Sequence, residues 1–183
     1  MKVKLTNVRL AFPALFEAKS IAGSEGAPAY GATLLIDPAT QKPLIDEINK
    51  AIDAVAVEKW GAKASSHLVA MRKGNKVALH DGDEKAQYAG FPGVMFVASR
   101  STVRPVVIDK DKSPLVAEDG KPYGGCYVNA TIQLWAQDNT YGKRVNAQLL
   151  GVQFLRDGDS FGGGAIGSVE DFDDLAVDEE ALA

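Results

Sequence analysis

One predicted hairpin gathers aromatic and basic side chains on the same face. Between Tyr127 and Trp135 the sequence alternates between apolar and polar residues, the period of a strand with one buried face. Tyr127 and Trp135 share the face that is not aliphatic, and after a turn containing Tyr141 the return strand begins Lys143-Arg144. Exposed rings can stack on unpaired nucleobases, and cations beside them can hold phosphates. The hairpin therefore predicts a binding surface for single-stranded nucleic acid, although either ring could instead pack in a small second core.

Two further basic groups could extend this surface. Arg100 and Arg104 bracket a polar interruption between two predicted strands, where hydroxyl and guanidinium groups favour phosphate contacts. Arg72, Lys73 and Lys76 surround Gly74 in a predicted loop that could clamp a nucleic acid strand. Ordinary solvated arginines and a plain turn remain open as alternatives for these groups.

The polar residues show no catalytic pattern. The two histidines and Cys126 lie far apart, without the spacing of a triad or a zinc site. Asp81, Asp83 and Glu84 resemble a metal loop but lack the remaining oxygen ligands, so a solvated turn is the better interpretation. We expect no enzyme activity, no metal and no cofactor, with a nuclease acting through these three acids as the alternative.

The charge is distributed unevenly along the chain. The formal net charge is −4, yet no Lys or Arg follows Arg156, and nine acids do. Residues 1–156 hold all 20 basic residues and 15 of the 24 acidic ones, which gives this part a net charge of +5. A basic body joined to an acidic tail indicates a polyanionic partner, although a merely solubilising tail would give the same pattern.

The composition indicates a cytoplasmic protein. No apolar run approaches the ~18 residues of a transmembrane helix, and the first residues alternate in polarity, unlike a signal peptide. The single cysteine, Cys126, excludes an intramolecular disulfide, fits a reducing compartment, and should be buried in a strand. We expect no membrane association.

Strand-like segments dominate the rest of the chain. They are expected at residues 3–16, with a bulge near Thr6-Asn7, and at 30–36, 77–79, 94–100, 103–108, 127–135 and 143–155. Apolar residues spaced by three and four predict one helix over 40–60, with Thr40 as its N-cap and Gly61 at its end. Residues 61–92 are expected to be mostly loop. The fold class is thus mainly β with one helix (α+β), as a small β-barrel.

The C-terminal segment differs from this body. Residues 161–168 are rich in glycine and predict a linker between a domain at 1–160 and a tail at 169–183. The tail is acidic with isolated apolar residues, a composition typical of disorder and of partner docking. The candidate docking residues are Asp171, Phe172, Asp173, Asp174 and Leu175.

Several segments together resemble a family of phage single-stranded DNA-binding proteins. They include 125–135, Gly142-Lys143-Arg144, 151–158, 30–35, 81–85, Arg100 with Arg104-Pro105, and the acidic run 170–174. The resemblance implies an oligonucleotide-binding (OB) fold, sequence-independent binding of single-stranded DNA in phage replication and recombination, and an acidic tail that regulates binding or docks phage or host replication proteins. It provides no residue-level DNA footprint.

A virion or assembly protein with a β-barrel domain is the alternative from another class. Such a protein has no need of the aromatic and basic face of the hairpin. The sequence leaves the oligomeric state open, a homodimer included.

Overall fold

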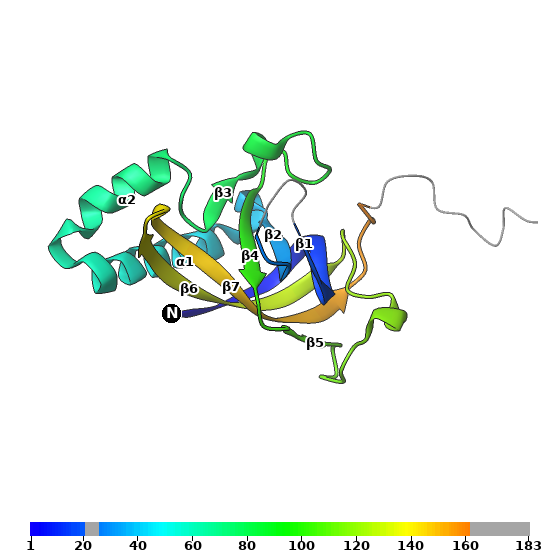
Figure 1. Ribbon diagram of the computed structural model, residues 1–183. Coiled ribbons are helices and arrows are strands. Elements are labelled where there is room, and N and C mark those ends of the chain that lie inside the picture. Colours follow the sequence, from blue (N-terminus) through cyan, green and yellow to red (C-terminus); the bar gives the residue numbers. More distant parts are fainter. Residues whose placement is uncertain (21–25, 162–183) are drawn as a thin grey trace, which may run out of the picture.

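Seven strands, two α-helices and three short 3₁₀ helices lie in the part of the chain that the structure describes, residues 1–20 and 26–161 of a computed structural model (Figure 1). The strands are β1 (Lys2–Lys19), β2 (Ala29–Ile36), β3 (Leu79–Asp81), β4 (Met95–Ser101), β5 (Val106–Ile108), β6 (Tyr127–Asn139) and β7 (Gly142–Arg156). The helices are α1 (Pro38–Trp60) and α2 (Ala64–Lys73). The predicted mainly β fold class is confirmed, and α2 is an addition to it.

Five strands close into a barrel. Their order is β4, β2, β1, β6 and β7, and β7 returns to pair with β4. This last pairing is parallel and short, joining Ser99 to Ala147 and Arg100 to Gln148, whereas the other four are antiparallel. β3 and β5 extend the sheet at its margins. The barrel is the OB-like closure expected from the sequence.

The β6–β7 hairpin follows the predicted alternation. The inward side chains of β6 are at most 4% exposed, and its outward side chains are partly or fully exposed. The inward set is Val128, Ala130, Ile132 and Leu134. Cys126, just before β6, is fully buried, as expected, and burial raises the pKa of its thiol. The core therefore depends on the aliphatic face and leaves the opposite face free for binding.

Two irregularities bend β1 around the barrel. The predicted bulge at Thr6-Asn7 is confirmed, because the register with β6 shifts between Leu5 and Val8 and Asn7 has φ 52°. A second irregularity lies at Phe12, where φ is 47° and the register with β2 shifts after Ala11. Bulges of this kind increase the local twist of a strand and redirect its side chains.

α1 begins earlier than predicted. Asp37, not Thr40, is the N-cap: its carboxylate accepts a hydrogen bond from the amide of Ala39 at 2.9 Å, and Pro38 occupies the first turn. The periodic apolar face is buried as expected, and Gly61 ends the helix with φ 55°. Pro43, a residue type common in the first turn of a helix, lies inside α1, two residues after a local kink at Gln41.

The expectation of a loop after Gly61 is wrong for residues 64–73, which form α2. Only Ala64, Leu68 and Met71 of this helix are buried, so its apolar stripe is too narrow to stand out in the sequence. No helix in the described ranges is long and apolar enough to cross a membrane.

Candidate nucleic-acid interface

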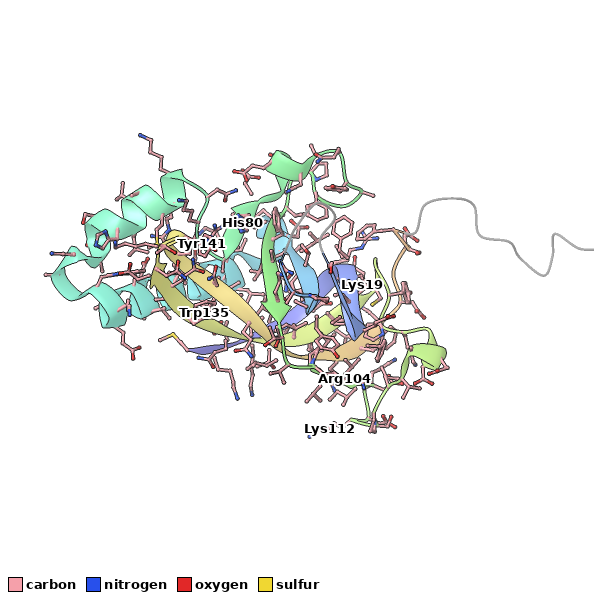
Figure 2. All side chains as sticks on the ribbon, in the orientation of Figure 1. Lys19, His80, Arg104, Lys112, Trp135 and Tyr141 are labelled. Atoms are coloured by element: carbon pink, nitrogen blue, oxygen red, sulfur yellow. The ribbon has the colours of Figure 1, made fainter. Side chains whose placement is uncertain are left out.

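Two hollows flank the outer face of β4, and we call these two hollows together the β4 groove. Ala98 and Arg100, both exposed, line the two hollows and join them. One hollow, about 350 Å³, lies toward β7, and the other, about 540 Å³, lies toward β1. Figure 2 shows His80 and Trp135 on one side of β4 and Lys19 on the other.

The β7 half of the groove combines one large exposed ring with several cations. Trp135 of β6, 45% exposed, lies at its margin, and Arg144 of β7 and Arg100 of β4 contribute guanidinium groups. Lys76 and His80 line the same hollow from the segment that precedes and forms β3. The structure thus brings together three of the predicted site residues, Trp135, Arg144 and Arg100, from three different strands.

The β1 half has a floor of small residues. Gly31 of β2 pairs with Arg100 of β4, and a Cβ atom on Gly31 would lie only 2.8 Å from the carbonyl oxygen of Ser99. Thr33 and Ala98 continue this floor, and Lys19 and Phe12 of β1 line the hollow. A flat floor with a cation at its edge allows the backbone of a ligand to approach the sheet closely.

The cations of the groove are available to an anion. Arg100, Arg144, Lys19 and Lys76 form no salt bridge within residues 1–20 and 26–161. His80 stacks on the ring of Phe96, with centroids 5.0 Å apart. Burial and the nearby positive charges of Arg144 and Lys85 lower the pKa of His80, while Glu84 opposes them. The groove is therefore an electropositive surface that favours phosphate binding.

Three other predicted residues do not line the groove. Tyr141 is 83% exposed at the tip of the β6–β7 hairpin. Lys143 lies 3.6 Å from the carboxylate of Asp138. Arg104 is exposed in the connection between β4 and β5, away from His80 and Trp135. Their roles in binding stay predictions.

Tyr127 does not share a platform with Trp135. The two residues lie on the same face of β6, but eight residues of extended strand separate them by roughly 26 Å. The guanidinium of Arg156 covers the Tyr127 ring at 3.7 Å, and Arg9 approaches it at 5.8 Å. The two rings are therefore well separated along β6, and the role of Tyr127 in DNA binding stays a prediction.

Arg72 and Lys73 do not form a basic loop. They occupy the last turn of α2, and Arg72 donates to the carboxylate of Asp53 on α1 at 2.8 Å. This pair joins the two helices and occupies the Arg72 guanidinium. Lys76, three residues further on, is the basic residue of this region that reaches the groove.

The acids that could have suggested a nuclease have structural contacts. Asp81 caps a short 3₁₀ helix by accepting from the amide of Asp83 at 2.9 Å. Asp83 accepts from the amide of Gly93, and Glu84 from the side chain of Asn75. The turn interpretation therefore accounts for all three acids.

Sequence reasoning missed Lys19, His80 and Phe12 as groove residues. Lys19 lies at the end of β1, Phe12 at an irregularity of the same strand, and His80 in the short strand β3. The neighbours of these strands in the sheet are distant in sequence. No residue type in the sequence signals the positive φ of Phe12. Lys76 was noted only as part of a loop.

The predicted linker and tail fall mostly outside the described residues. Phe161 is described and contacts the body, with its amide donating to the carbonyl of Gly124 at 2.9 Å. The docking candidates Asp171, Phe172, Asp173, Asp174 and Leu175 lie outside the described residues, and the division at residues 160 and 168 stays a prediction.

Comparison with known families gives one match over almost the whole chain. A family model described as the ssDNA-binding protein of Enterobacter phage Enc34 matches residues 1–182. Putative protein p50 of Acyrthosiphon pisum secondary endosymbiont phage 1 is 49% identical over 182 residues, 98% of this chain and 97% of that protein.

Solved structures show the same fold. The single-stranded DNA-binding protein from bacteriophage Enc34, in complex with ssDNA, superposes with a TM-score of 0.75 at 27% identity, covering 88% of this chain and 89% of that one. The gp2.5 protein encoded by bacteriophage T7, a single-stranded DNA-binding protein, gives a TM-score of 0.54 at 15% identity over 91% of this chain and 98% of that one. At this identity the second match is a likeness of fold.

Proposed function

Because this chain belongs to the family of the ssDNA-binding protein of Enterobacter phage Enc34, we propose that it binds single-stranded DNA without regard to sequence, in the replication and recombination of a phage genome. The observation that carries the proposal is the β4 groove, where an exposed indole lies among cations without salt-bridge partners in the described ranges. Stacking supplies affinity for any base, and the cations bind phosphates.

The groove and the family favour binding over the virion alternative. The contacts of Asp81, Asp83 and Glu84 are those of a turn, so the chain is proposed to act by binding, without cleaving DNA. The host cytoplasm is the proposed location, which suits a protein that meets replicating phage DNA.

A role for the acidic tail is part of the proposal. Residues 169–183 contain seven acids and no base. These acids can compete with DNA phosphates for the cations of the β4 groove, because a tethered anion acts at a high effective concentration. When DNA displaces them, Phe172 and Leu175 become available to a phage or host replication protein.

The direct test is a comparison of single-stranded and duplex DNA by fluorescence anisotropy at several salt concentrations. We expect tighter binding of the single strand, weakening as salt rises, because stacking needs unpaired bases and the cations release counterions. Equal affinity for duplex and single strand at moderate salt would contradict stacking in the β4 groove.

A further inference from the structure

Phe12 combines a strained backbone with an exposed ring. Its φ of 47° lies in the left-handed region, which is unfavourable for a residue with a Cβ atom, and its side chain is 58% exposed. An exposed phenylalanine contributes little to the core, so packing of its own ring does not explain why the strain is retained. Strain of this kind occurs at ligand-binding sites.

The ring of Phe12 forms one wall of an apolar pocket. It meets Tyr88 edge to face, with centroids 5.0 Å apart, and Phe91 at 5.8 Å. Phe91 is only 2% exposed and anchors the group, while Tyr88 is 41% exposed. Together with Phe161 these rings border a hollow of about 420 Å³, which we call the Phe12 pocket.

The Phe12 pocket continues the β4 groove. Phe12 and Pro13 line both the pocket and the β1 half of the groove. Lys19 lines that half, and Arg100 of β4 lines both halves, between the pocket and Trp135. Trp135 and the Phe12 pocket therefore lie at the two ends of one path, which crosses β6, β7, β4, β2 and β1. The path covers four strand spacings, roughly 19 Å along the sheet.

We propose that the Phe12 pocket binds an unpaired nucleobase at the end of the path opposite Trp135. The inference rests on the proposed function, since the base belongs to a strand that crosses the groove. Phosphates along the path meet Arg100 and Lys19, and the base at its end meets the rings of Phe12 and Tyr88. The positive φ at Phe12 directs the ring toward the pocket while the strand continues in the sheet.

A nucleobase is the occupant favoured over an apolar side chain of a protein partner. The pocket opens onto a hollow with two cations, and a nucleotide carries both the apolar face and the anion that this combination requires.

The test is an anisotropy titration of Phe12→Asn with oligothymidylates of increasing length, on the full chain. Asparagine tolerates the left-handed region, so the variant loses the ring while keeping the backbone. We expect an affinity loss of roughly 5- to 150-fold, the effect of one lost stack, for oligomers long enough to span the path. Shorter oligomers bound at Trp135 should be unaffected. Phe12→Trp should retain wild-type affinity, and Val69→Ala, an exposed apolar residue on α2, is the matched control.

The outcomes separate the two proposals. Unchanged affinity of Phe12→Asn at every length, while Trp135→Ala weakens binding, overturns the base pocket and leaves the proposed function in place. Failure of the wild-type chain to prefer single strands overturns the proposed function itself. If Phe12→Asn lowers the unfolding temperature, Tyr88→Leu replaces it, and the same loss confined to long oligomers supports the pocket.

Discussion

Replacing Trp135 with alanine should weaken DNA binding while keeping the fold. The indole is 45% exposed, whereas its neighbour Leu134 is 1% exposed and points into the barrel. About half of a large side chain is therefore buried, which puts the loss of stability at about 1–2 kcal/mol. A domain with a typical stability of ~5–15 kcal/mol stays folded after such a loss.

The loss of DNA-binding free energy should be a larger fraction of its total than the loss of folding stability is. One lost base stack costs ~1–3 kcal/mol, which corresponds to roughly 5- to 150-fold in Kd. Anisotropy of a labelled oligothymidylate measures this loss, and thermal unfolding checks the fold. Intrinsic fluorescence adds a second readout, because the remaining indole, Trp60, donates to Asp138 at 2.9 Å and does not line the groove. Quenching by DNA should therefore disappear in Trp135→Ala.

Two control variants show which result would contradict the prediction for Trp135→Ala. Trp135→Phe retains a ring and should keep most of the affinity. Tyr127→Ala removes a ring that Arg156 covers and that lies outside the groove, so it should leave binding of short oligomers unchanged. If Trp135→Ala binds like the wild type while Tyr127→Ala is impaired, the DNA does not follow the β4 groove.

Three further outcomes are expected. Arg100→Gln and Arg144→Gln should each reduce the slope of log K against log salt by ~0.7, the value for one lost phosphate contact. Arg72→Gln should leave the slope unchanged, and equal slopes in all three variants would contradict phosphate binding in the β4 groove. Deleting 169–183 should tighten DNA binding at low salt, with a gain that shrinks as the Debye length shortens; an unchanged Kd at low salt means that the tail does not compete. Burial lowers the pKa of His80 below its usual 6.5, so the unfolded chain takes up the proton first and stability should fall as pH drops through that value. Urea unfolding of wild type and His80→Gln across this range should show a smaller pH dependence in the variant, and identical curves would refute it.

Local patterns in the sequence determined most of the fold. The alternation from Tyr127 to Trp135 reports the two faces of a strand, and the buried face of α1 follows from its apolar spacing, because both depend on neighbours within a few residues. The bulge at Asn7 and the end of α1 at Gly61 were also predictable. The same local patterns were enough to predict Trp135, Arg100 and Arg144 as candidate binding residues.

The tertiary structure alone decided which of these side chains meet. Closure of the barrel pairs β4 with β7, which places Arg100 beside the hairpin and brings in Lys76 and His80 from a segment with no clear pattern of its own. The same geometry separates Tyr127 from Trp135 and assigns Arg72 to Asp53. A groove across several strands is a relation between residues distant in the chain, and the period of a single strand holds no information about which strand will lie beside it.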